Sequence, residues 1–248
     1  MVDLFQASGA ILFFVCASSP AMALRENVAA FETPELVAPG VVSRKDRHEF
    51  GSVVSKDGSR LYIGVDHGEW SSIEWYAFRD GGWREGGRVL GEPDFSANDP
   101  FLSFDGGRLY FISPRNGQHD IGYVEQISPD VWGAPAFEDP PINSPGEEYY
   151  ISFTRRGDFV FASDRDAARD GDFDIYRAVK GADGRFAVER FPDGVNGDGY
   201  EADAFIDPDG RYLVFSSNRE GGFGRGDLYV SFAASAAGWT APRWTRRC

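Results

Sequence analysis

The sequence predicts an all-β protein: a β-propeller of four blades, each a four-stranded sheet of about fifty residues. Its main support is a turn followed by an alternating apolar run, which occurs four times as SKDGSRLYIG, SFDGGRLYFIS, FTRRGDFVFAS and DPDGRYLVFSS. The turns, counted at Asp57, Asp105, Arg155 and Asp209, lie 48, 50 and 54 residues apart. A period of this length is typical of propellers and solenoids. The composition agrees, because 15% aromatic residues and 30 glycines suit short packed strands joined by tight turns.

The predicted repeats span residues 47–95, 96–144, 145–197 and 198–244. In the last two repeats, two-residue alternation and flanking turn residues predict four strands each. These strands are 147–153, 158–163, 173–179 and 185–191, then 201–207, 211–217, 227–232 and 239–244. Beyond the first 23 residues no segment has apolar residues at helical spacing. We therefore expect a single propeller domain over residues 24–248.

A large ring opens the fourth strand of every repeat, at Trp83, Trp132, Phe186 and Trp239. One aromatic residue at the same place in each repeat is explained most simply as packing between neighbouring sheets. Stacking on a carbohydrate is the alternative role for these rings.

Arginine and aspartate also recur on either side of one hairpin loop in three repeats. An Arg and an Asp that flank a loop can form a charge-assisted pair, which would hold the hairpin closed. The predicted pairs are Arg115 with Asp120, Arg165 with Asp174 and Arg219 with Asp227.

The first 23 residues predict a secretory signal peptide. The apolar run Ala10–Ser18 is too short to span a bilayer as a helix, and Ala21–Ala23 forms an A-x-A cleavage site. The segment before the run has Asp3 and no Lys or Arg, which leaves a buried N-terminal strand as the alternative. Removal of the signal leaves no membrane span, so a periplasmic or secreted location is expected.

The two cysteines predict a mature chain without an internal disulfide. Cys16 lies within the signal and would be removed with it, which leaves only the terminal Cys248. That thiol is either incidental or a site for linking two chains.

The charge excludes some partners. With a net charge of −14 and a pI of about 4.6, the chain lacks the basic surface that nucleic acid or an anionic membrane requires. A cationic partner or a divalent metal is better suited to the negative electrostatic field of the chain, although the acidic residues can also serve only to keep the protein soluble.

Several segments resemble a known family of repeats. PPINSPGEEYYISFTRRGDFVFASDR, GDFDIYRA and YEADAFIDPDGRYLVFSSNREGGFGRGDLYVSF with GWTAP are similar to the TolB-type WD40-like (PD40) β-propeller repeats of bacterial envelope proteins. The resemblance covers about residues 34–243. It implies one four-stranded sheet per repeat and an envelope or extracellular setting, and it brings no catalytic residues. Such propellers usually have six or more blades, so four repeats predict a small ring, an open arc or a truncated product.

Two acidic features are candidate sites. Glu49, Glu147 and Glu201 share a repeat position just before the innermost strand, where the second repeat has Ala97. They are expected to form a partial acidic ring that binds a partner at the axial mouth. The loop 164–174 offers closely spaced carboxylates that suit Ca²⁺, although solvated turn aspartates are the more common case. Its candidate ligands are Asp164, Asp166, Asp170, Asp172 and Asp174.

The sequence contains no nucleotide-binding loop, hydrolase elbow or metalloprotease motif, and no cysteine cluster. His48, His67 and His119 occupy different repeat positions and are expected at the surface. The leading hypothesis is therefore a non-enzymatic scaffold that binds an envelope protein or a cell-wall glycan, without cofactor and without nucleic acid. The alternatives are a carbohydrate-active hydrolase or lyase with its site at the axial mouth, and a degenerate paralogue.

Cleavage after Ala23 gives a first prediction. The mature protein should begin at Leu24 and carry a charge of −13, because the removed segment contains one acidic residue, Asp3, and no basic one. N-terminal sequencing and intact mass of the natural protein measure this. An intact Met1 in the cytoplasm would contradict the export hypothesis.

Overall fold

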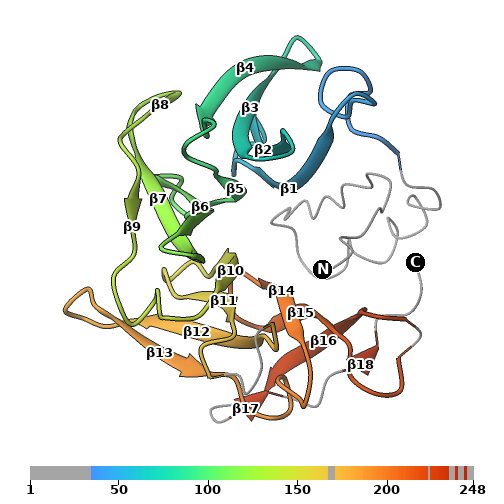
Figure 1. Ribbon diagram of the computed structural model, residues 1–248, viewed down its shortest axis with the longest axis vertical. Helices are drawn as coiled ribbons and strands as arrows, with labels where there is room; N and C mark the ends of the chain where they lie inside the picture. The colour runs from blue at the N-terminus through green and yellow to red at the C-terminus, as the bar shows by residue number, and fades with distance from the viewer. Residues whose placement is uncertain (1–34, 167–170, 223, 235–237, 240–242, 245–248) are drawn as a thin grey trace.

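The computed structural model describes residues 35–244 apart from 167–170, 223, 235–237 and 240–242. Four antiparallel sheets surround a central axis as the blades of a β-propeller (Figure 1). Within the described residues every regular element is a strand, as the sequence predicts. The expected signal segment and both cysteines lie outside these residues.

Each blade is a meander in which successive strands pair, with the first strand innermost (Figure 1). The first blade contains β1 (His48–Val54), β2 (Arg60–Asp66), β3 (Ser71–Arg79) and β4 (Gly82–Leu90). The second contains β5 (Asn98–Leu102), β6 (Arg108–Arg115), β7 (Gln118–Ser128) and β8 (Val131–Trp132), and β9 (Ala136–Phe137) also pairs with β7. The third contains β10 (Glu148–Phe153), β11 (Phe159–Ser163), β12 (Asp174–Lys180) and β13 (Phe186–Arg190). The fourth contains β14 (Glu201–Ile206), β15 (Tyr212–Ser217), β16 (Asp227–Ala234) and β17 (Gly238–Trp239), and β18 (Arg243–Trp244) also pairs with β16.

The turn between the first two strands of each blade requires glycine. Gly58, Gly106, Gly157 and Gly210 have φ angles of 70–85°, and each donates its N–H to the carbonyl three residues earlier. Three of these glycines follow an aspartate. In the third blade, Arg156 stands at the position of these aspartates. The sequence pattern places the turn at Arg155, which is one residue too early.

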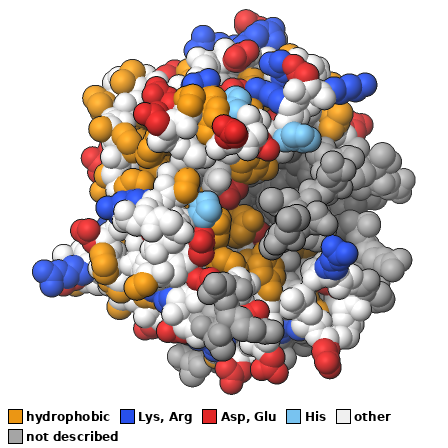
Figure 2. Space-filling view, in the orientation of Figure 1, with side chains coloured by type: hydrophobic (Ala, Val, Ile, Leu, Met, Phe, Trp, Pro, Cys, Tyr) orange, Lys and Arg blue, Asp and Glu red, His pale blue; other side chains and the backbone are white. Residues whose placement is uncertain are grey.

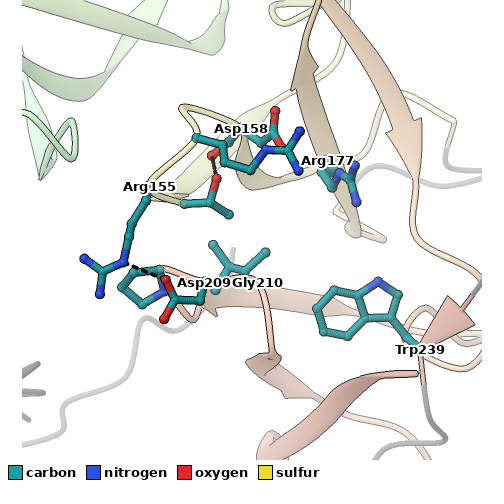
Figure 3. A pocket seen from close by; sticks show the side chains of 10 residues that line it. Arg155, Asp158, Arg177, Asp209, Gly210 and Trp239 are labelled. Carbon is teal, nitrogen blue, oxygen red and sulfur yellow. Dashed lines mark hydrogen bonds and ion pairs between the residues drawn. The ribbon is translucent and has the colours of Figure 1, made fainter. Parts of the chain in front are cut away.

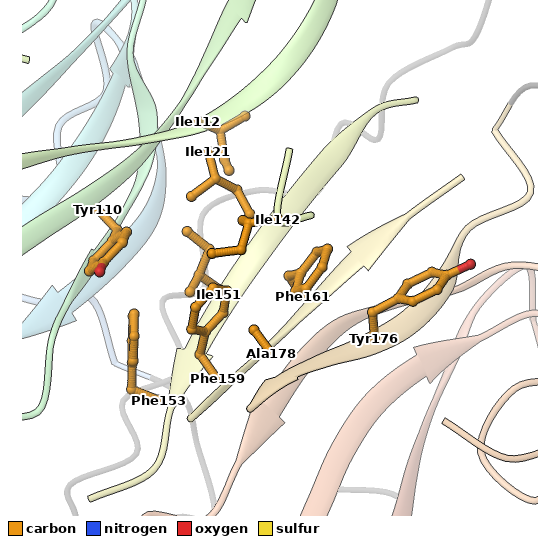
Figure 4. Packing of buried hydrophobic residues seen from close by; sticks show 10 residues of the cluster. All are labelled: Tyr110, Ile112, Ile121, Ile142, Ile151, Phe153, Phe159, Phe161, Tyr176 and Ala178. Atoms are coloured by element: carbon orange, nitrogen blue, oxygen red, sulfur yellow. The ribbon is translucent and has the colours of Figure 1, made fainter. Parts of the chain in front are cut away.

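The core lies between blades. The cluster between the second and third blades joins Ile112 and Ile121 to Ile151 and Phe159 (Figure 4). Trp132, Phe186 and Trp239 pack into clusters between blades, as predicted; Trp132, for example, lies edge-on to Tyr62 of the preceding blade with ring centroids 5.8 Å apart. Trp83 instead packs against a cluster of the first blade and the segment before it.

The predicted arginine–aspartate pairs are only partly formed. Arg115 and Asp120 lie 3.4 Å apart in the second blade. In the third blade Arg165 contacts Glu148 instead, and Asp174 pairs with Arg190 at 2.6 Å. In the fourth blade Arg219 likewise contacts Glu201 rather than Asp227. Both pairings are therefore corrected: the arginines turn toward a buried glutamate because an unpaired buried charge costs more than an exposed one.

A buried carboxylate fixes the start of the fourth blade. Glu201 is fully buried and lies opposite Ser217 in the sheet register. It accepts hydrogen bonds from Ser217 Oγ at 2.5 Å and from the N–H of Gly197 at 2.6 Å, and pairs with Arg219 at 3.1 Å. Arg219 also donates to the carbonyl of Val195. We call this arrangement the entry cluster, because it ties the incoming linker to the first two strands of the blade.

The entry cluster recurs in two other blades. In the third, Glu148 contacts Ser163 and Arg165, which donates to the carbonyl of Ile142. In the first, Arg47 pairs with Glu49 at 2.7 Å and donates to the carbonyl of Val42. The second blade has Ala97 at the glutamate position, beside Asn98, which pairs with Ile112.

Asparagines tie the same linkers to the preceding blade. Asn196 is fully buried; its Oδ1 accepts from the N–H of Ile175, and its Nδ2 donates to the carbonyls of Ile175 and Phe191. Asn143 makes the same contacts with Ile121 one blade earlier. Each of these two linkers is therefore held on both sides by buried side chains.

The entry cluster gives a prediction on stability. Arg219→Ala should lower the free energy of unfolding by about 3 kcal/mol, because it leaves the Glu201 carboxylate buried without its cation. Urea unfolding measures this loss. The matched control is Arg155→Ala, because Arg155 pairs with Asp209 at 2.6 Å with both side chains exposed, and we expect a loss of less than about 1 kcal/mol. Equal losses in the two variants would contradict the role of the cluster.

Candidate binding site at the propeller axis

The four innermost strands share a β-bulge near the axis. The register shifts within β1, β5, β10 and β14, and at each shift one residue adopts a left-handed conformation. These residues are Gly51, Asp99, Tyr150 and Asp203, with φ angles of 46–55°. The three that are not glycine are strained, and strain of this kind persists only where the surrounding structure enforces it. The four innermost strands face the centre of the propeller (Figure 1).

Close packing explains the glycine at the first position. A Cβ at Gly51 would lie 2.5 Å from Asp99 Oδ1 and 3.0 Å from its Cα. No larger residue fits without moving Asp99, so the bulge of the first blade makes room for the carboxylate of the second.

The axial carboxylates influence each other's protonation. Burial, followed by the nearby charge of Asp203, raises the pKa of Asp99 from 3.8 to about 7. Partial loss of hydration also raises the pKa of Asp203, although the residue as a whole is exposed, while a hydrogen bond from Tyr150 lowers it. The pKa of Tyr150 is raised by burial and then by Asp99 and Asp203. Three residues from three blades thus share one electrostatic site, in which Tyr150 remains 36% exposed.

Aromatic rings border these carboxylates. Tyr149 lies 5.8 Å from Tyr150 and 5.5 Å from Phe173 between ring centroids, and Phe173 lies 6.0 Å from Tyr200. His119 contacts Tyr149 with centroids 5.0 Å apart. On the face seen down the same axis, hydrophobic and acidic side chains and a histidine lie beside one another near the centre (Figure 2). Aromatic faces beside carboxylates form an environment that attracts cations.

The three glutamates predicted for the axial mouth are not brought together as a ring. Glu147 Oε2 lies 2.7 Å from His119 Nδ1 and accepts a hydrogen bond from Tyr149, so it borders the aromatic residues. Glu49 and Glu201 belong to entry clusters and are buried against arginines. The residue equivalent to Glu201 is Glu148, because both lie opposite the last serine of the second strand. The alignment that grouped Glu147 with the other two was wrong by one residue.

The aspartates of the loop 164–174 have separate partners. Asp164 accepts from the N–H of Glu147, Asp166 from the hydroxyl of Tyr176, and Asp174 pairs with Arg190. Asp172 is also engaged by another group, and Asp170 lies outside the described residues. Within the described part of the chain, no three His, Cys, Asp or Glu side chains are placed to hold a metal ion.

Sequence reasoning missed Asp99, Tyr150 and Asp203 as site residues. Asp99 and Asp203 each lie two residues after the aligned positions Ala97 and Glu201, so the repeat alignment already pairs them, whereas the one-residue error at Glu147 displaces Tyr150 from this set. The left-handed conformation itself leaves no mark on the sequence, since neither Asp nor Tyr requires it.

Comparison with solved structures identifies the fold. The chain is similar to TolB from Acinetobacter baumannii, with a TM-score of 0.55 and 17% identity over 79% of this chain and 44% of that one. The chain has a β-propeller fold. It is also similar to a puromycin-hydrolyzing peptidase from Mycobacterium tuberculosis (TM-score 0.55, 15% identity, 84% of this chain and 30% of that one). A third similar structure is an α-L-arabinanase from Penicillium chrysogenum (TM-score 0.52, 14% identity, 76% and 60%).

These similarities establish the fold alone, because all the identities are low. The sequence matches no protein-family model and no curated protein. The chain spans less than half the length of the Acinetobacter TolB. None of the described residues forms a helix with the length and apolar character needed to cross a membrane.

The raised pKa of Asp99 gives a prediction on pH. The folded state binds this proton up to about pH 7, whereas the unfolded state releases it near 3.8, so the folded state holds more protons between these values. The contribution of Asp99 to stability is therefore greatest below that window and falls as the pH rises through it. Asp99→Asn should remove this decline in urea unfolding series, and the exposed Asp94→Asn should keep it. Identical slopes for Asp99→Asn and the wild type would contradict the assignment.

Proposed function

We propose that this chain is a non-enzymatic binding module whose axial site takes a positively charged group of an envelope protein or a cell-wall component. The observation that carries the proposal is the convergence of Asp99, Tyr150 and Asp203 at equivalent left-handed positions around the axis. Two carboxylates brought together leave negative charge that a ligand can neutralise.

The surroundings support a cationic ligand. Neither Asp99 nor Asp203 pairs with a Lys or Arg among the described residues, and aromatic rings border both. An ammonium or guanidinium group would relieve the repulsion between the carboxylates and lie against these rings. The net charge of −14 would speed the approach of a basic partner.

The cellular setting is part of the same proposal. The predicted signal segment favours export, and the similarity in fold to TolB fits a binding role without establishing it. A periplasmic or secreted protein that holds another envelope component at its axis accommodates both observations.

A carbohydrate-active hydrolase or lyase is the second candidate. Its supporting observation is Asp99, a carboxyl group with a pKa of about 7 next to a second carboxylate, as general acid catalysis requires. The similarity in fold to an α-L-arabinanase fits this candidate without establishing it. Release of reducing or unsaturated sugars from a glycan panel, lost in Asp99→Asn, would establish it in place of the binding role.

The axial site gives a prediction on partner binding. Immobilised mature protein should retain a stoichiometric component from its native envelope fraction, and hexalysine should displace that component. Asp99→Asn combined with Asp203→Asn should lose at least about tenfold in affinity, because the attracting charge is gone. Asp80→Asn, in the exposed turn between the outer strands β3 and β4, changes net charge away from the axis and should bind like the wild type. Equal retention by the axial double variant would overturn the proposed site.

A further inference from the structure

A cavity of about 410 Å³ opens between the third and fourth blades, away from the inner-strand bulges. Its lining includes Arg155, Arg156, Asp158, Arg177, Asp209 and Trp239. Figure 3 shows Arg155 and Arg177 approaching from different sides, with Trp239 at the border. Three arginines on one cavity stand out in a chain with a net charge of −14.

Arg177 replaces a residue that fills the equivalent space elsewhere. Arg177 belongs to β12 and lies opposite Val160 of β11. At the same position the first blade has Trp75 and the second blade has Tyr123. Those rings pack into the clusters between the first and second and between the second and third blades. The fourth blade has Val230 at this position. An arginine here leaves an opening where other blades have apolar contacts.

Arg156 is a second departure from the repeat, in the turn that lines the same cavity. The other three blades have aspartate at this position. Asp105, for example, accepts hydrogen bonds from Ser103 Oγ at 2.6 Å and from the N–H of Gly107 at 3.0 Å, which stabilise its own turn. Arginine cannot accept these bonds, so the fold gains nothing from the exchange.

Neither of these two arginines has a counter-ion. Arg155 pairs with Asp209 at 2.6 Å, but no ion pair involves Arg156 or Arg177 among the described residues. The Nε of Arg177 is buried and has no hydrogen-bond acceptor. A buried donor without an acceptor is costly, and a ligand that supplies one would remove that cost.

We propose that this cavity binds an acidic sugar of the uronic acid class. The carboxylate of the sugar accepts hydrogen bonds from Arg156 and Arg177, and its ring lies against the indole of Trp239. Asp158 and Asp209 accept from its hydroxyl groups. A fully ionised inorganic anion has no hydroxyl groups to donate to these two carboxylates, which is why a ligand with both acid and hydroxyl groups fits better. The volume lies in the range of pockets that hold small molecules.

The repeat supplies its own test variants. Arg156→Asp restores the turn residue of the other blades, and Arg177→Tyr restores the residue of the second blade, so both should fold at least as well as the wild type. Tri-galacturonic acid is the probe, its neutral methyl ester is the matched ligand control, and inorganic phosphate tests for a simple anion site. Calorimetric titration at low salt measures binding, and the melting temperature reports on folding.

The wild type should bind the acid and bind the methyl ester at least about tenfold more weakly, since the ester lacks the charge that the arginines recognise. Each arginine variant should lose at least about tenfold in affinity for the acid while its melting temperature is unchanged or higher. The axial variants Asp99→Asn and Asp203→Asn should bind the acid normally, which separates this cavity from the axial site. Absence of binding to the wild type, equal binding of the ester, equal binding of phosphate, or normal binding by both arginine variants would each overturn the proposal.

Discussion

A glutamate buried against an arginine determines how three of the four blades begin. Glu148 and Glu201 have no exposed surface, so their charges are tolerable only while an arginine and serine hydroxyls surround them. The same arginines hold linker carbonyls, and buried asparagines hold the linkers to the blade before. The inner strand then leaves the cluster in a fixed direction, and the bulge comes two residues later at the axis. The axial geometry therefore depends on a contact that takes no part in binding.

The position of each axial residue is therefore determined separately from the chemistry of its side chain. The fold specifies a left-handed residue near the axis in every blade, but the side chain at that place is free to differ. Glycine in the first blade gives space, aspartates in the second and fourth give charge, and Tyr150 in the third gives a hydroxyl group between them. The cavity between the third and fourth blades is a second example. Arg177 occupies a repeated position at which the other blades have apolar residues, and a polar opening replaces the packed interface there.

The strands and the turns between them were predictable because alternation and turn glycines act locally. The pairing of Arg165 and Arg219 was not, because sequence spacing places each arginine near two carboxylates and only burial decides between them. Asp99 and Asp203 escaped notice because nothing in the sequence marks their position as a bulge at the axis. The cavity was not predictable either, because it depends on the combined side-chain volumes of two blades at their interface, and the sequence of a single repeat does not determine that sum.

The second blade differs from the others in how it is joined. Ala97 replaces the glutamate, and the linker before it is held by neutral hydrogen bonds, including those between Ser71 and Ser96 and between Ala97 and Ser71. The other three attachments each contain a carboxylate held against an arginine, so they depend on a charge pair that this joint does not use. Loss of an arginine by mutation can therefore loosen the first, third or fourth blade, whereas the attachment of the second blade tolerates such a change.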